Sequence, residues 1–146
     1  CTPEMFVRYA QIAALMPVMQ FSASPWRVLP EADFQKVKAA LALREKCLPE
    51  ILKAVECAKV TGEPIVRSME FVFPGQGMER VMDQFMVGED LLVAPVWKQG
   101  EVARSVRLPE GQWRCVGLGE TEGDVLNGGR DVILGENEGL VVLKRV

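Results

Sequence analysis

The sequence contains no histidine in its 146 residues. A Ser-His-Asp triad, a catalytic Cys-His pair and any metal site built on imidazole are therefore excluded within this chain. Long apolar runs are also missing, and none approaches the roughly 20 residues that a membrane-spanning helix needs. Lysine and arginine number 17 against 20 acidic residues, so the net charge of −3 provides no electrostatic footprint for nucleic acid.

The cysteines form no CxxC pair, and they stand at Cys1, Cys47, Cys57 and Cys115. Cys47 and Cys57 fall in one helical pattern, which separates them too far along the helix for a disulfide. We expect reduced and mostly buried thiols, which favours a reducing compartment such as the cytoplasm. The lack of an Asn-x-Ser/Thr acceptor site agrees weakly with this, and the compartment itself stays open.

The residues that are present describe a globular chain. Hydrophobic residues make up 49% and charged residues 25%, which argues against disorder and allows one domain or two small lobes. The first residues predict a helix start, with Thr2 as N-cap and Pro3 in the first turn. Because the sequence opens directly into a helix, we expect it to be part of something larger, with any targeting segment outside it.

Helical periodicity dominates the first part of the chain. Residues 2–16 carry an apolar stripe that predicts a helix, and Pro17 ends it. The short apolar stretch Val18–Ser22 predicts a buried strand. A long amphipathic helix is expected from about Asp33 to Val60, with Pro49 kinking or dividing it.

Beyond Gly62, which is suited to a left-handed helix cap, the pattern becomes β. A short helix is predicted over Glu79–Met86. Turn signals at residues 109–111, 127–129 and 137–139 separate the later strands. The predicted strands are Ile65–Phe73, Leu91–Val96, Ala103–Leu108, Gln112–Val116, Asp131–Leu134 and Leu140–Val146.

The helical part is incomplete by itself. Two helices and one strand leave the backbone groups of the strand unpaired and both helix stripes uncovered. A helix-strand-helix order with a buried strand is typical of one end of a (β/α)₈ barrel, or TIM barrel. We therefore predict an α+β chain, with the last barrel elements in residues 1–62 and an antiparallel β-sandwich domain in residues 63–146. The remainder of the barrel would be its partner.

Several ordered motifs carry a family resemblance. The sequence of residues 6–11, FVRYAQ, followed by LMP at 15–17, resembles the late barrel of glycoside hydrolase family 31, the α-glucosidase and α-xylosidase family. The stretch at 61–67, TGEPIVR, is similar to the passage out of that barrel. MDQFMVG at 82–88 and DLLVAPV at 90–96 are similar to the start of the sandwich that follows it, and RLPEGQW at 107–113 continues the match.

The resemblance implies a retaining α-glycosidase with two catalytic aspartates, which hydrolyses terminal α-linked sugars without metal or organic cofactor. The two carboxyl groups of a retaining enzyme lie about 5 Å apart, one as nucleophile and one as acid/base. In this family both belong to earlier barrel strands, and no stretch here matches either motif. We therefore expect no catalytic residue in this chain, and an inactive isolated fragment.

The same resemblance points to a substrate-facing segment at Met19-Gln20-Phe21-Ser22. Many family members have Arg-Asn-His here, and the histidine contacts the sugar. The sequence of this segment resembles that of the branch that contains the myogenesis-regulating glycosidase and bacterial relatives, some of which cleave α-galactosides. An α-glucoside, an α-galactoside and an α-xyloside therefore remain open as substrates. Gln20, Phe21 and Ser22 are candidate substrate contacts, and the alternative for Phe21 and Ser22 is that they merely close the end of the barrel.

Two further candidates lie on the loop that follows. Trp26 offers an indole face for stacking on a sugar, and Arg27 offers a guanidinium for its hydroxyls. The alternative is that the pair anchors the loop. Arg8 is expected to be a structural ion-pair partner, and Trp97 and Trp113 are expected to be packing residues of the sandwich.

Three carboxylates, Asp83, Glu89 and Asp90, stand beside the apolar run 91–96 and raise the question of acid/base chemistry. Their position in the resemblance is the junction of barrel and sandwich. We therefore expect structural roles, with Asp83 opening a helical turn or pairing with an arginine.

The rival interpretation is a non-catalytic carbohydrate-binding or interaction module. In that case the three tryptophans would form an exposed sugar platform. They are Trp26, Trp97 and Trp113.

Overall fold

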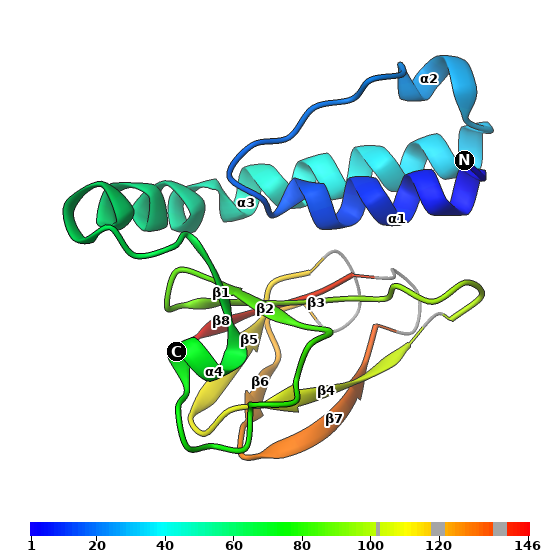
Figure 1. The fold of residues 1–146 in the computed structure, drawn as a ribbon. Helices are drawn as coiled ribbons and strands as arrows, with labels where there is room; N and C mark the ends of the chain where they lie inside the picture. Colours follow the sequence, from blue (N-terminus) through cyan, green and yellow to red (C-terminus); the bar gives the residue numbers. More distant parts are fainter. Residues whose placement is uncertain (102, 118–121, 136–139) are drawn as a thin grey trace.

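The computed structural model describes residues 1–101, 103–117, 122–135 and 140–146. Its elements form three layers (Figure 1): helices above, a six-stranded sheet in the middle and a two-stranded sheet below. The upper layer contains α1 (Pro3–Ala14), α2 (Pro25–Val28) and α3 (Glu31–Thr61). The predicted mixture of helices and antiparallel strands is confirmed. None of the helices in the described ranges is long and apolar enough to cross a membrane.

The helix layer begins and ends as the sequence predicts. Thr2 caps α1, because its Oγ1 accepts a hydrogen bond from the Met5 amide at 3.2 Å. Gly62 ends α3 in the left-handed conformation, with φ of 75°. Helix α3 runs as one element through Pro49, so this proline does not divide it, and a kink at Pro49 stays a prediction. Cys47, Ile51 and other buried residues on both sides of Pro49 pack into one core, which favours continuity over a break.

The middle sheet is antiparallel throughout, in the order β1-β2-β3-β8-β5-β6. Strands β4 and β7 pair separately below it. The bounds are β1 (Val66–Ser68), β2 (Phe85–Val87), β3 (Leu91–Pro95), β4 (Arg104–Leu108), β5 (Gln112–Cys115), β6 (Val125–Asn127), β7 (Arg130–Leu134) and β8 (Leu140–Arg145).

Strand β3 is buried on both faces. Leu91 and Val93 pack into the core under the helices, while Leu92 and Ala94 pack into the core against the two-stranded sheet. The side chains of its neighbour β8 alternate between the same two cores. A strand covered on both sides needs apolar residues at every position, which explains the uninterrupted run that the sequence shows here.

The strand predictions after residue 90 are confirmed within a residue or two, but three earlier predictions are wrong. Val18–Ser22 is an irregular connection with bends at both ends and not a strand, because no strand among the described residues lies beside it to pair with it. Ile65–Phe73 splits into β1 and the short helix α4 (Met69–Val72), which Ser68 caps. Glu79–Met86 forms no helix, since its end enters β2 and pairs with β3.

Two smaller outcomes complete the comparison with the sequence. Strand β6 was not predicted, because its three residues carry little pattern. The predicted turn at 137–139 lies outside the described residues.

Polar contacts also join the layers. The Glu4 carboxylate accepts a hydrogen bond from the Gly100 amide at 2.8 Å, and the Arg8 guanidinium donates to the Glu101 carbonyl at 2.7 Å. Arg8 also lies 3.8 Å from Glu4. The expected structural role of Arg8 is thus confirmed, and the start of α1 is fastened to the β3–β4 connection.

The lower core contains Trp113, whose expected packing role is confirmed by complete burial. Its ring meets Phe73 edge-on at 5.8 Å, and its Nε1 donates to the Pro109 carbonyl at 3.0 Å. We expect Trp113→Phe to lower the free energy of unfolding by about 2–4 kcal/mol, through a cavity and the loss of the indole hydrogen bond to the Pro109 carbonyl. The control Trp97→Phe changes an exposed side chain and should stay within about 0.5 kcal/mol. Urea unfolding followed by circular dichroism measures both, and equal effects would contradict the packing described.

Burial under the helices raises the pKa of the Cys47 thiol from 9.0 to about 11, with the Glu50 carboxylate acting in the same direction. The unfolded thiol ionises first, so this contribution to stability is complete below pH 9 and is lost as the pH rises to 11. The gap in unfolding free energy between the wild type and Cys47→Ala should therefore narrow from pH 8 to pH 11. Cys57→Ala, on a less buried part of the same helix, is the control. A difference in unfolding free energy between the wild type and Cys47→Ala that does not change with pH would refute the raised pKa of Cys47.

Candidate functional site

The five residues predicted to contact substrate lie on one connection, which joins α1 to α3. Gln20, Ser22, Trp26 and Arg27 are exposed, and Phe21 is half-buried. Among the described residues, no hydrogen bond or ion pair links the stretch 20–22 to Trp26 or Arg27. The structure therefore places all five candidates on the same connection, where they form two separate groups.

Exposure alternates along the first group. Val18, Gln20 and Ser22 are exposed, whereas Met19 and Phe21 pack against the helices. Phe21 stacks in parallel on Phe6 of α1, with ring centroids 5.8 Å apart and an angle of 5° between the ring planes. Successive side chains of an extended backbone point to opposite sides. Gln20 and Ser22 therefore face away from the helix layer, and Phe21 faces toward it.

Arg44 of α3 holds the start of this connection, and sequence reasoning missed it. Its Nη1 donates to the carbonyls of Ala14 and Met16 at 2.7 and 2.6 Å, and its Nη2 donates to the carbonyl of Pro17 at 3.2 Å. Carbonyls at a helix C-terminus lack partners within their own helix, and a cation also suits that end of the helix dipole. An arginine amid the apolar pattern of residues 33–60 was the only available signal.

The second group lies on α2, a single helical turn. Trp26 is 67% exposed there, while Leu29, just beyond the turn, packs with the residues around Val37. Trp26 and Arg27 are thus displayed by a turn whose far end is anchored. In the described part of the chain, no group of three or more cysteine, aspartate or glutamate side chains is placed to hold a metal ion.

Asp83 is committed to an ion pair. Its carboxylate lies 2.6 Å from Nη2 of Arg104, whose side chain is 6% exposed. Arg104 also donates to the carbonyl of Pro95 at 2.8 Å, at the end of β3. The expected pairing with an arginine is confirmed, although the alternative helical turn is absent.

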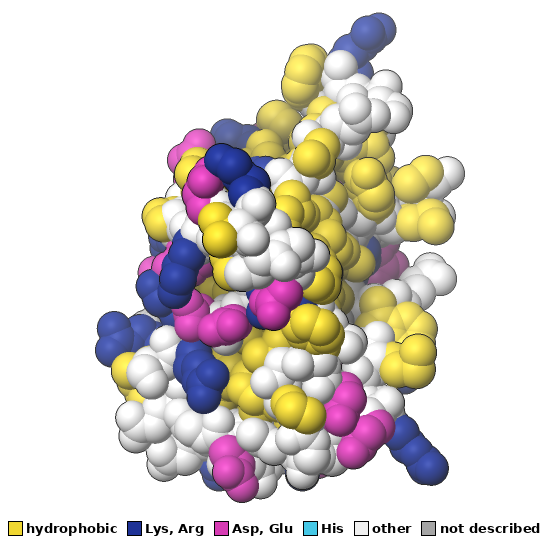
Figure 2. Space-filling view, turned by 60° about the vertical axis from the view of Figure 1, so that its left-hand side comes forward, with side chains coloured by type: hydrophobic (Ala, Val, Ile, Leu, Met, Phe, Trp, Pro, Cys, Tyr) yellow, Lys and Arg dark blue, Asp and Glu magenta, His cyan; other side chains and the backbone are white. Residues whose placement is uncertain are grey.

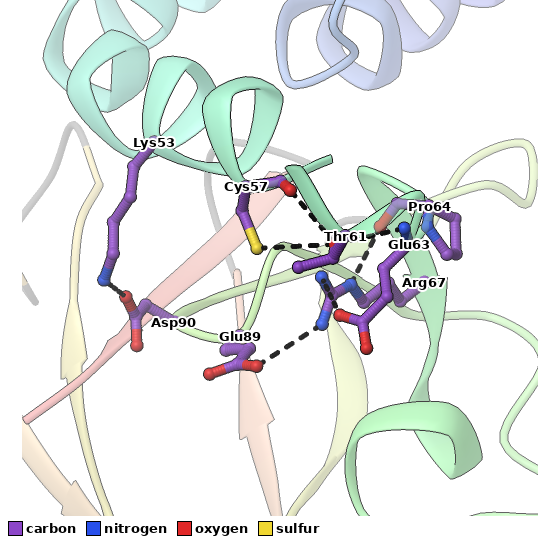
Figure 3. A network of polar contacts seen from close by, with 8 residues as sticks. All are labelled: Lys53, Cys57, Thr61, Glu63, Pro64, Arg67, Glu89 and Asp90. Carbon is purple, nitrogen blue, oxygen red and sulfur yellow. Dashed lines mark hydrogen bonds and ion pairs between the residues drawn. The ribbon is translucent and has the colours of Figure 1, made fainter. Parts of the chain in front are cut away.

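Glu89 and Asp90 lie in the turn between β2 and β3, below the end of α3 (Figure 3). Glu89 pairs with the buried Arg67 at 3.6 Å, and Asp90 pairs with Lys53 of α3 at 2.5 Å. The hydrogen bond from Lys53 to Asp90 raises the pKa of that lysine. Asp90 therefore fastens α3 to the sheet, and Glu89 fastens the β2–β3 turn to Arg67 of β1, which confirms the structural roles expected from the sequence.

Arg67 is the centre of that polar network. Its Nε donates to the Pro64 carbonyl at 2.8 Å, and its Nη2 lies 2.9 Å from the Glu63 carboxylate. The guanidinium also lies over the Phe71 ring, 5.5 Å from its centroid. A buried arginine with this many partners fixes the chain where the helices give way to the sheets.

The tryptophans do not form one platform. Trp113 is fully buried, so it cannot contact a ligand at the surface. Trp97 is 58% exposed, which makes the prediction that it packs inside the sandwich wrong. Lys98 covers one face of its ring at 5.5 Å. A three-tryptophan sugar platform is therefore excluded, and only Trp26 and Trp97 are accessible.

Comparison with known proteins places this geometry in a family. Residues 62–133 match the model of the glycosyl hydrolase family 31 C-terminal domain. The mouse myogenesis-regulating glycosidase is 39% identical over 112 residues, which cover 76% of this chain and 16% of that protein. An α-glucosidase of Saccharolobus solfataricus is 30% identical, over 86% of this chain and 18% of that protein.

Solved structures agree. A family 31 α-xylosidase from a soil metagenome, complexed with xylose, superposes with a TM-score of 0.83 at 29% identity. The match covers 98% of this chain and 25% of the xylosidase chain, so the present chain spans about a quarter or less of the relatives that it matches. The chain belongs to glycoside hydrolase family 31.

Proposed function

We propose that this chain is the C-terminal part of a retaining α-glycosidase that hydrolyses terminal α-linked sugars. Residues 1–62 would be the last elements of its (β/α)₈ barrel, and residues 63–146 would be the sandwich beside that barrel. The observation that carries the proposal is the segment 18–22, whose exposure alternates as in a strand, although no strand in the described ranges lies beside it. A barrel contributed by the rest of the protein would supply the missing neighbours.

The outer surface of the helix layer supports the same arrangement. Hydrophobic side chains gather in the upper half of the molecule, where the helices lie (Figure 2). Exposed apolar residues there come from α1, α3 and the connection between them: Met5, Tyr9, Val18, Trp26, Leu48 and Leu52. Apolar exposure on this scale is typical of a surface that another part of the protein covers.

The proposed division of labour follows from the carboxylates. Retention needs a nucleophile and an acid/base about 5 Å apart. Asp83, Glu89 and Asp90 are instead held by Arg104, Arg67 and Lys53, which supports placing the catalytic pair on barrel strands outside this chain. This chain would then contribute one wall of the sugar pocket and the support behind it.

The proposed wall consists of Gln20, Ser22, Trp26 and Arg27. The Gln20 amide and the Ser22 hydroxyl can donate to and accept from sugar hydroxyls, and Arg27 can donate. Trp26 offers a stacking face. Phe21, which stacks on Phe6, would back this wall rather than touch the sugar. The fitting substrate class is a terminal α-glucoside, α-galactoside or α-xyloside, and no organic cofactor or metal is required for this chemistry.

The proposal is tested with the full-length protein that carries this chain. We expect it to be several times heavier than 16.2 kDa and to release nitrophenol from at least one of the nitrophenyl α-glucoside, α-galactoside and α-xyloside. Proton NMR during turnover should show the α-anomer as first product, as retention requires. The isolated 146-residue chain should release none. A native protein of 16.2 kDa, a β-anomer, or turnover by the isolated chain would each refute the proposal.

A non-catalytic carbohydrate-binding module is the second candidate, and the exposed Trp26 and Trp97 are the observation that favours it. If the glycosidase proposal is right, adding up to about 10 mM monosaccharide to the isolated chain should leave tryptophan fluorescence unchanged, because a sugar pocket needs several converging walls. A saturable shift that Trp97→Phe or Trp26→Phe abolishes would favour the binding module instead.

A further inference from the structure

We propose that Arg44 is a positioning residue, which sets the side chains of segment 18–22 that face the sugar. The inference rests on the proposed glycosidase function, because it assigns a role within the same sugar pocket. Arg44 lies on α3, makes no hydrogen bond to Gln20 or Ser22, and would act through the backbone carbonyls that it holds.

The first step concerns where Arg44 binds. Two of its three carbonyl partners, those of Met16 and Pro17, lie beyond the last residue of α1 and directly before segment 18–22. A cap that served α1 alone would need only carbonyls inside the helix, such as that of Ala14. By holding Met16 and Pro17 as well, the guanidinium fixes the point at which the extended segment starts.

The second step is the alternation that follows this fixed point. Counting from Pro17, the odd residues Met19 and Phe21 pack inward, and the even residues Gln20 and Ser22 face outward. The stack of Phe21 on Phe6 locks the same phase four residues later. A displacement by one residue would exchange the two sets and turn Phe21 toward the sugar. Arg44 and the stack of Phe21 on Phe6 therefore decide which side chains of the segment face the sugar.

The third step is the residue type. Arginine presents donors in a rigid planar fork, so one side chain reaches three carbonyls from fixed directions. A lysine has three donors on one nitrogen, which cannot cover carbonyls spread over a helix end and the turn beyond it. Arg44→Lys keeps the charge and most of the size while removing the fork, which makes it the discriminating variant.

The test uses the full-length protein with Arg44→Met and Arg44→Lys. Lys36→Met is the matched control, because Lys36 lies on the same helix and, among the described residues, its ion-pair partner is the nearby Asp33. Hydrogen exchange of the amides at 18–24 should quicken about tenfold or more in Arg44→Met, less in Arg44→Lys, and not in the control. Exchange that stays at the wild-type rate in both Arg44 variants would overturn the proposal, without bearing on the glycosidase function.

The kinetic test asks whether Arg44 acts through the outward residues. We expect Arg44→Met to lower kcat/KM about tenfold or more, but less than about threefold in a background that already carries Gln20→Ala and Ser22→Ala. A merely structural role would give the same factor in both backgrounds and would overturn the proposal. If Arg44→Met fails to fold, Arg44→Lys is measured in the same two backgrounds. A wild-type protein that cleaves none of the three glycosides would remove the proposed function together with this inference.

Discussion

Burial of the central strand pair on both faces is the constraint on which the structure depends. Strands β3 and β8 share one ladder, in which Leu92 lies opposite Leu143 and Val93 opposite Val142. One face of that ladder closes the core under α3, and the other closes the core around Trp113. The stability of both cores therefore depends on the same backbone hydrogen bonds between β3 and β8.

Arginines perform the complementary task at the ends of elements. Arg44, Arg67 and Arg104 each donate to main-chain carbonyls in places where the chain leaves a helix or a strand. Such carbonyls have no partner in a regular ladder, and leaving them dry costs free energy. The apolar layers supply the driving force, while these three side chains satisfy the backbone at the points where the layers meet.

The sequence predicted those features that are set by local periodicity. Both long helices, the Thr2 and Gly62 caps and the strands after residue 90 follow from patterns that need no partner to be recognised. Two of the failures share one cause, because each concerns a segment whose state depends on distant pairing. Glu79–Met86 has helical spacing, yet its last residues pair with β3, and Val18–Ser22 has strand character but no neighbour. The candidate site was predicted as a set of residues, whereas Arg44, which holds it, lay hidden in the long helix.

The strand order has a consequence for how the chain is made. The final strand, β8, occupies the centre of the sheet, between β3 and β5, which precede it by many residues. During synthesis from the N-terminus, β3 and β5 therefore emerge without the strand that joins them. Until β8 follows, the sheet covers the helix layer only in part. Contacts between distant segments are slow to form, because a long loop must close first. Until residues 140–145 leave the ribosome, the apolar faces of α3 and β3 stay open to water, so the nascent chain is exposed to aggregation throughout that interval.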